Sequence, residues 1–276
     1  MQYLMMRSYS LPLIPPFQFG ATMRKLSFSP DLMRQADGIL EKSRDWANYI
    51  SVVEKEIPVA RLREGESDLW PGAFMAAKRL QEQTCTVEGV HDRARRARYR
   101  KVEEFSDAED EATPHAALLV LLQEITHMVE GTGLEWVLNK THFVADFENG
   151  RQYNAYCDGA LRRTSDLSSK LSKGMRARKS RTIITQEACE IVMKHPQSSI
   201  FKDHFLLSSQ DRHQIFLTFA RFRQKLFEYY KDGAYTNEFL SLKTFGPWDT
   251  ENPLRLVHLA KVITSAIMIA KAALHV

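Results

Sequence analysis

A short part of the chain holds residue types that could cleave phosphodiester bonds with the help of a metal ion. Asp158 ends the strand-like run "RQYNAYCD", Lys170 follows in "SSK", and Gln186 opens a helical pattern. A carboxylate can hold a hard cation such as Mg²⁺, which polarises a phosphate and lowers the pKa of a bound water molecule. A nearby ammonium can stabilise the charge that develops during attack. These residues predict a hydrolytic phosphodiester site.

The spacing of these residues predicts which faces of the strands and of the helix carry them. Alternate residues of a strand share a face, so the even-numbered residues 152–158 form one comparatively polar face that ends at Asp158. Lys170 would lie on a short neighbouring strand formed by residues 168–170. Gln186 and Glu190 are four residues apart and therefore share one face of a helix.

Apolar spacing predicts the helices and strands that would hold the site. Ser29 and Pro30 are typical of a helix start, and Pro114 opens the strongest helical pattern, which should end near Gly131. Asn149-Gly150 between two alternating runs predicts a β-hairpin. The expected helices cover residues 30–57, 72–84, 114–130, 182–195, 224–232 and 253–274, and the expected strands cover residues 134–140, 141–149, 151–159, 200–207, 214–220 and 237–245.

The order of these elements predicts an α/β (α+β) protein with a mixed central sheet flanked by helices. Residues 1–30 carry Pro12, Pro15 and Pro16, which would break the amphipathic helix of a transit peptide, so a flexible leader is expected. Residues 31–112 should form a helical N-terminal extension that ends in a charged linker. Residues 113–276 should form the main α/β domain.

Several runs resemble the PD-(D/E)XK nuclease superfamily. An acidic residue closing one strand, a lysine on the next and a helix opening with Gln are similar to the motifs of that superfamily. More narrowly, "FENGRQYNAYCDGALRR", "TIITQEACEIV" and "IFLTFARFRQKLFEYYKDG" resemble nuclease-like domains of many uncharacterised proteins of filamentous fungi. The resemblance covers residues 114–276 and implies a core like that of restriction endonucleases.

The resemblance implies roles for four residues. Asp158 would be a Mg²⁺ ligand, Lys170 the stabilising ammonium, Gln186 an orienting residue, and Glu124 an additional acid and metal ligand. The superfamily places an Asp or Glu two residues before the lysine, and this chain has Ser168 there. With one strand carboxylate instead of two, Mg²⁺ would be held weakly, so catalysis is expected to be weakened or lost.

A basic segment follows Asp158 and predicts contact with nucleic acid. The net charge of the chain is only +4, so the local distribution matters more than the total. Basic residues near a sheet edge could neutralise phosphates of DNA or RNA without reading sequence. The expected contacts are Arg162, Arg163, Lys173, Arg176, Arg178, Lys179 and Arg181. The alternative is a non-catalytic module that binds nucleic acid or an acidic protein partner.

Each site residue also has an ordinary interpretation. Asp158-Gly159 is a good turn dipeptide for a plain hairpin. Lys170 could be a solvated cation, and Gln186 could cap a helix. Glu124 lies in an apolar helix, where it must face water, a cation or a metal. The Glu124–His127 spacing is that of di-iron bundle proteins, but the similar spacing of Glu88 and His91 falls outside any convincing buried helix, so this metal interpretation is not favoured.

Composition, cysteine content and absent motifs limit the classes of protein to which the chain can belong. The chain has 276 residues with 44% hydrophobic content, enough for a substantial core. Cys85, Cys157 and Cys189 form no CxxC pair, which favours a reducing intracellular location, cytoplasm or nucleus. The apolar C-terminal segment is interrupted by charged residues, so a buried helix is expected instead of a membrane span. No P-loop, GxGxxG or GxSxG motif is present.

Overall fold

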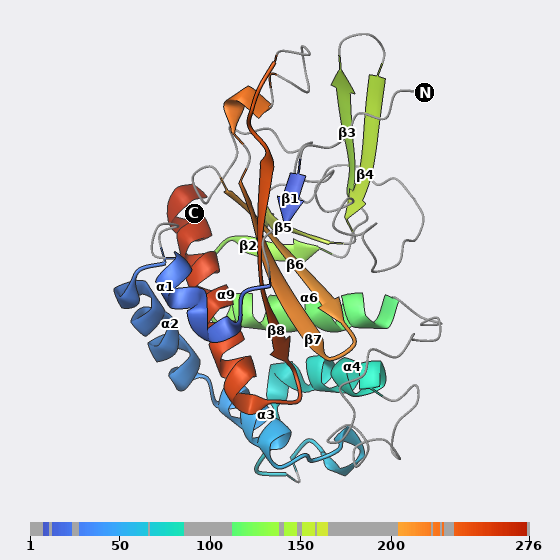
Figure 1. Cartoon of the computed structure of the whole chain (residues 1–276). Coiled ribbons are helices and arrows are strands. Elements are labelled where there is room, and N and C mark those ends of the chain that lie inside the picture. The colour runs from blue at the N-terminus through green and yellow to red at the C-terminus, as the bar shows by residue number, and fades with distance from the viewer. Residues whose placement is uncertain are drawn as a thin grey trace, which may run out of the picture.

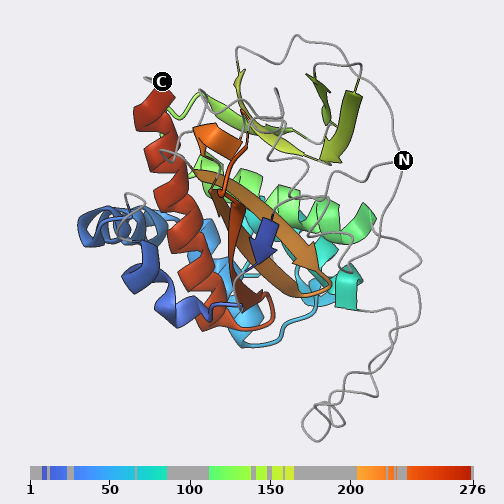
Figure 2. The same cartoon turned by 45° about the horizontal axis from the view of Figure 1, so that its top comes forward.

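The protein has a mixed α/β fold, as the sequence predicts. The computed structural model describes residues 8–10, 13–23, 28–65, 67–85, 112–137, 141–147, 151–157, 159–164, 204–221, 223–226, 228 and 235–274. These residues form a four-stranded sheet, sheet A, and two two-stranded ladders, with helices packed around them. Figures 1 and 2 show the long C-terminal helix α9 beside sheet A, with the N-terminal helix α2 on the outer side of α9.

The N-terminal helices are set by two serine caps. α2 (Pro30–Lys42) begins where the sequence predicts, because Ser29 Oγ accepts a hydrogen bond of 3.1 Å from a backbone amide of its first turn. The expected helix over residues 30–57 is in fact two helices. Ser43 Oγ accepts a second capping hydrogen bond of 3.2 Å and starts α3 (Arg44–Glu54). The apolar spacing continues across this break, so periodicity did not reveal it.

A carboxylate from α3 fixes the start of the next helix. The 3-10 turn η4 (Gly72–Phe74) leads into α4 (Met75–Cys85), and Asp45 Oδ2 accepts the Ala73 amide hydrogen at 2.9 Å. Gly72 has a φ of +53°, and a Cβ on it would overlap the Asp45 carboxylate. Only glycine fits here, because the left-handed backbone and the close carboxylate both exclude a side chain.

Sheet A is mostly antiparallel. Its order is β1–β8–β7–β6, formed by β1 (Ser8–Ser10), β8 (Leu240–Asp249), β7 (Gln214–Arg221) and β6 (His204–Asp211). Only the β1–β8 pair is parallel. Residues Ile215, Leu217 and Phe219 alternate along β7 and are fully buried, so this face of sheet A is the core face.

The second group of elements is one helix followed by a bent antiparallel ribbon. α6 (Ala112–His127) precedes β2 (Leu134–Val137), β3 (Thr141–Phe147), β4 (Arg151–Cys157) and β5 (Ala160–Arg163). β3 pairs with β4, which confirms the predicted hairpin, although its Asn149-Gly150 turn lies outside the described residues. β5 pairs back with β2. In Figures 1 and 2 the β3–β4 hairpin projects beyond sheet A.

The C-terminal helix is a core helix with the predicted bounds. α9 (Pro253–Leu274) is long and apolar enough to cross a membrane, but 56% of its apolar window is buried inside the protein. The Trp248 Nε1–H group donates to His258 Nδ1 at 2.9 Å, and the two rings stack. Trp248 thus holds the helix against sheet A. β8 continues to Asp249, so the chain turns toward α9 only after that residue.

The flexible-leader prediction is wrong for the described N-terminal residues. β1 runs along β8, and the Ile14 amide donates to the Thr244 carbonyl at 2.9 Å. Phe19 opens α1 (Phe19–Met23), just after η1 (Pro16–Gln18), and is fully buried against Phe245. β1 and β8 lie far apart in the sequence, so their pairing leaves little local signal. The prolines alone therefore predicted a flexible segment where the chain is paired and packed.

One apolar cluster joins the two ends of the chain. It contains Phe19, Trp46 of α3, Leu121 of α6, Leu217 of β7 and Leu259 of α9. The N-terminal helices and sheet A therefore share a core, although the expected division near residue 112 stays a prediction. The expected helix over residues 182–195 lies outside the described residues.

Gly72→Ala should destabilise the protein by about 2–4 kcal/mol, because it adds backbone strain and displaces Asp45 from its hydrogen bond. Gly38→Ala in α2 is the matched control. No atom lies within 4 Å of a Cβ at Gly38, so this change should stabilise the protein by up to about 1 kcal/mol. Chemical denaturation of both variants measures the difference, and equal stabilities would contradict the described packing.

Acid should weaken the Trp248–His258 contact. Burial lowers the pKa of His258 below its usual 6.5, and the positive charge of Lys261 lowers it further. Between the native and unfolded pKa values the unfolded chain binds more protons, so this contribution is complete above pH 6.5 and decreases as pH falls below it. The melting temperature of His258→Gln should fall less between pH 7 and pH 5 than that of the wild type; an equal fall would exclude this role.

Candidate functional site around α6 and the β2–β5 ladder

Three of the predicted site residues lie in the described part of the chain. They are Glu124 on α6 and the neighbouring Arg162 and Arg163 on β5. The other predicted residues lie outside the described residues: Asp158, Lys170, Gln186, Lys173, Arg176, Arg178, Lys179 and Arg181. The site can therefore be built from the elements that flank Asp158 in sequence.

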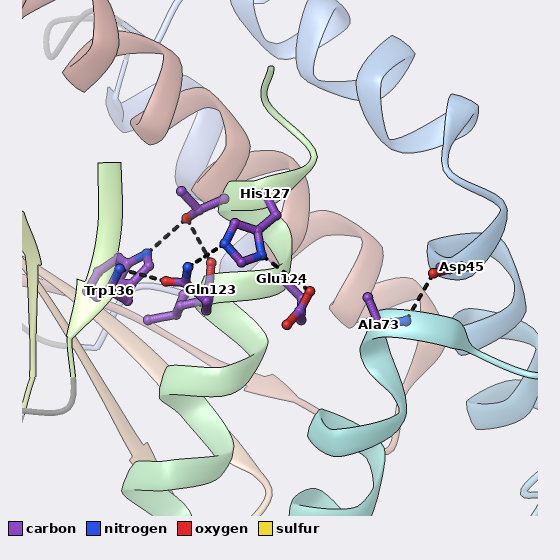
Figure 3. Close-up of polar contacts among 8 residues, drawn as sticks. Asp45, Ala73, Gln123, Glu124, His127 and Trp136 are labelled. Carbon is purple, nitrogen blue, oxygen red and sulfur yellow. Dashed lines mark hydrogen bonds and ion pairs between the residues drawn. The ribbon is translucent and has the colours of Figure 1, made fainter. Parts of the chain in front are cut away.

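One side of α6 holds the β2–β5 ladder. The Trp136 backbone amide donates to Gln123 Oε1 at 2.6 Å, and Trp136 Nε1–H donates to Thr126 Oγ1 at 2.9 Å. The Thr126 hydroxyl in turn donates to the Leu122 carbonyl at 2.8 Å. Both N–H groups of Trp136 are thus satisfied by α6, as buried polar groups generally must be. Figure 3 shows these contacts joining the helix to the strand.

Gly159 brings the ribbon against the same side of α6. A Cβ on Gly159 would lie 2.5 Å from Leu119 Cδ1 and 3.1 Å from the Val137 carbonyl oxygen. No side chain fits between the helix and β2 at this point, so a glycine is required by close approach. The backbone next to Asp158 in sequence is therefore fixed against α6.

The strand pairing excludes the plain-hairpin interpretation of Asp158-Gly159. β4 pairs with β3 and β5 pairs with β2, so β4 and β5 are not partners joined by a turn. Residue 158 instead falls between the end of one ladder and the start of the next. Val137 pairs with Ala160, and Thr141 pairs with Cys157. The two pairs are four residues apart on one side of the ribbon and three residues apart on the other.

Glu124 takes part in a hydrogen-bonded group on α6 itself. Its Oε2 lies 3.5 Å from His127 Nδ1, and His127 Nε2 lies 2.6 Å from Gln123 Nε2 (Figure 3). Because Gln123 Oε1 accepts from Trp136, the amide nitrogen of Gln123 is the donor toward His127. His127 Nε2 therefore accepts, and the ring proton sits on Nδ1, directed at Glu124.

This arrangement limits what the group can do chemically. Both nitrogens of His127 have partners, so the ring is not presented as a free base or metal ligand. Glu124 is five residues from Leu119, about 140° around the helix, and lies away from the side that contacts Gly159. Its side chain is 19% exposed, which satisfies the expectation that it faces water or a cationic partner.

The prediction that Glu124 and Asp158 share a metal ion stays a prediction, because Asp158 lies outside the described residues. Among the residues that the structure describes, no group of three or more His, Cys, Asp or Glu side chains could hold a metal ion. The di-iron interpretation of Glu124 and His127 likewise gains no further ligand within this part of the chain.

The two β5 arginines differ in their surroundings. Arg162 is half-buried and takes the position opposite Glu135 in the β2–β5 ladder. Arg163 is exposed at the end of the ladder, opposite Leu134. Arg162 thus faces a cross-strand carboxylate, whereas Arg163 ends the ladder.

Sequence reasoning missed the residues that position the ladder. Gln123, Trp136 and Gly159 were not singled out as positioning residues, although each fixes the ribbon on α6. A signal was present at Gln123, because a polar side chain in so apolar a helix must find a hydrogen-bond partner. The partner, a backbone amide on the next strand, could not be read from spacing.

No family model, curated protein or solved structure matches the chain. The nuclease resemblance therefore rests on the sequence motifs alone.

Gly159→Ala should destabilise the protein by about 1–3 kcal/mol, because the added methyl group overpacks the contact between β5 and α6. Leu119→Ala should remove part of this cost when the two changes are combined, since Leu119 Cδ1 is the closest atom. Denaturation of the two single variants and the double variant measures the coupling. Simple additivity would show that the two residues are not in contact.

Proposed function

We propose that the protein is a PD-(D/E)XK nuclease-like protein that binds nucleic acid and whose Mg²⁺-dependent cleavage is weakened or lost. The order of the described elements supports this proposal. α6 is followed by β2, the β3–β4 hairpin and β5, and a further strand, β6, comes after the segment that contains Lys170 and Gln186. This order is compatible with the helix, strands, helix and strand that the resemblance implies for a restriction-endonuclease-like core.

The observation that carries the proposal is the attachment of Gly159 to α6. It fixes the backbone beside Asp158 between two strand ladders, where the resemblance expects a strand-end carboxylate. A functional side chain benefits from such a rigid support, because its position is then set by packing. A mere turn dipeptide would have no need of this close contact with a helix.

The weakened catalysis in the proposal follows from the number of carboxylates. Ser168 replaces the second strand carboxylate, and Glu124 is directed to His127 on a different side of α6. Mg²⁺ prefers hard oxygen ligands in near-octahedral geometry. The described donors fit such an ion poorly, so Asp158 is the one residue proposed to contact it.

Binding is the better-supported part of the proposed function. Arg163 is exposed at the end of the β2–β5 ladder, and the basic segment begins there. Contacts of this kind bind phosphates without reading bases, and they release counterions on binding. The proposed protein therefore retains DNA or RNA in a salt-dependent manner.

The test is an incubation of the purified chain with plasmid DNA and with RNA, in Mg²⁺ or Mn²⁺, beside a retention assay at low and high salt. We expect salt-sensitive retention and little or no cleavage, and any cleavage should disappear in Asp158→Ala. Asp31→Ala is the matched control, because Asp31 is an exposed carboxylate on α2 whose side chain is 72% exposed.

Each other outcome changes the conclusion in a defined way. Rapid cleavage that depends on Asp158 would show an intact nuclease and overturn the weakened-catalysis part. Cleavage that survives Asp158→Ala would remove Asp158 from the site. Absence of both cleavage and retention would favour the alternative of a protein-interaction scaffold.

A further inference from the structure

The β3–β4 hairpin has one apolar and one largely polar face. Its register places Phe143 opposite Ala155 and Ala145 opposite Tyr153, so these four residues share a face. The residues of the other face are His142, Val144, Asp146, Gln152, Asn154 and Tyr156. The hairpin is therefore amphipathic, and its apolar face needs a partner or a larger sheet to be stable in water.

Both edges of the hairpin are open in the part of the chain that the structure describes. β3 and β4 pair only with each other there, and neither makes extensive contact with any other described helix or strand. Figures 1 and 2 show the hairpin projecting beyond sheet A. A two-stranded hairpin alone is at best marginally stable, whereas a sheet of three or more strands with an apolar face can be stable. An added strand would thus stabilise it.

The outer edge of β3 has few of the features that protect an edge strand from pairing. Its sequence, "THFVADF", contains neither proline nor lysine, and its register with β4 runs without a bulge. Native edge strands often carry such features, because an exposed regular edge otherwise pairs with another chain. β3 is therefore suited to accept a further strand.

The charges of β3 are complementary to those of a second, antiparallel copy of the same strand. When two copies pair about Val144, His142 of each copy lies opposite Asp146 of the other. The sequence continues this pattern, with Lys140 before β3 and Glu148 after it. Opposite charges directly across two strands stabilise a sheet, and like charges destabilise it. The pattern thus favours a second copy of β3 as the added strand.

The same register also matches the apolar face, and the other edge of the hairpin offers no such match. Phe143 of one copy lies opposite Ala145 of the other, so apolar residues meet apolar residues. If β4 paired with its own copy about Asn154, Gln152 would lie opposite Tyr156 and no opposite charges would meet on that face. β3 is therefore the edge that selects its own copy.

We propose that a second copy of this chain binds along β3, antiparallel and with a two-fold axis at Val144. The two hairpins then form one sheet in the order β4–β3–β3–β4, and their apolar faces become continuous. An interface of this kind is isologous, because the same residues serve both copies. Main-chain hydrogen bonds along the edge supply affinity, and the charge pairs fix the register. This association goes beyond the proposed function and does not require nucleic acid.

The test measures the molar mass of the full chain by sedimentation equilibrium over a range of concentrations, after nucleic acid has been removed. We expect an equilibrium between monomer and dimer. His142→Asp places two acids opposite each other, and Asp146→Lys places two bases there, so each change should raise the dissociation constant about tenfold or more. Within the hairpin these positions face the uncharged Tyr156 and Gln152, so neither change brings like charges together inside one copy.

Two rescue experiments test the register itself. A chain that carries both changes again has an acid opposite a base, and it should dimerise like the wild type. A mixture of the two single variants should also associate, because position 142 of each chain then meets a complementary charge at position 146 of the other. Failure of both rescues in folded variants would overturn antiparallel pairing about Val144.

An engineered cross-link gives a second measurement that does not depend on charge. Directly opposite residues of antiparallel strands have Cα atoms about 4.5–5.5 Å apart, a distance that a disulfide can span. Val144→Cys should therefore form a covalent dimer under mild oxidation, with peptide mapping showing a bond between the two copies of position 144. A folded variant that forms no such bond would contradict the proposed axis.

Asp31→Lys is the matched control, because Asp31 is exposed on α2, away from the hairpin in Figures 1 and 2. It should leave the dissociation constant unchanged. Melting temperatures identify variants that fail to fold. A wild-type chain that stays monomeric at every concentration would overturn the proposal, and so would a dimer whose dissociation constant is unchanged in both folded single variants of β3.

Discussion

The attachment of the β2–β5 ladder to α6 determines how the candidate site is presented. Trp136 places both of its N–H groups on α6 side chains, and Gly159 allows β5 to approach the helix without an intervening side chain. Hydrogen bonds fix the ladder along the helix, and the glycine contact fixes its distance from the helix. Together they fix the start of β5, and hence the backbone that follows Asp158, relative to the core.

The same attachment decides the direction of Glu124. Because Leu119, Gln123 and Thr126 face the ladder at helical spacing, Glu124 must lie on another side of α6. The sequence showed correctly that this carboxylate needs a polar environment. It could not show that His127, one turn along the helix, would supply it.

Local signals in the sequence were reliable and long-range ones were not. Ser29 and Pro30 start α2 as predicted, and Pro253 starts α9, because caps and proline act within a single turn. The break at Ser43 and the addition of β1 to β8 were missed. The pairing of β1 with β8 depends on contacts between residues far apart in sequence, whereas the break at Ser43 is a local serine cap that the continuous apolar spacing concealed.

The described acids and bases largely stabilise the fold itself. Glu124 is directed to His127, Glu238 to Arg223, and Asp45 to the Ala73 amide, so these carboxylates already serve the fold. Described bases are committed in the same way, since Lys78 pairs with Glu82 and Lys271 donates to the Glu130 carbonyl oxygen. A hydrolytic site needs acids free to hold a cation, whereas a binding site needs bases directed at a common point. These contacts commit the acids and bases concerned to the fold, so the proposed function depends on the charges of the segment from Asp158 to Arg181.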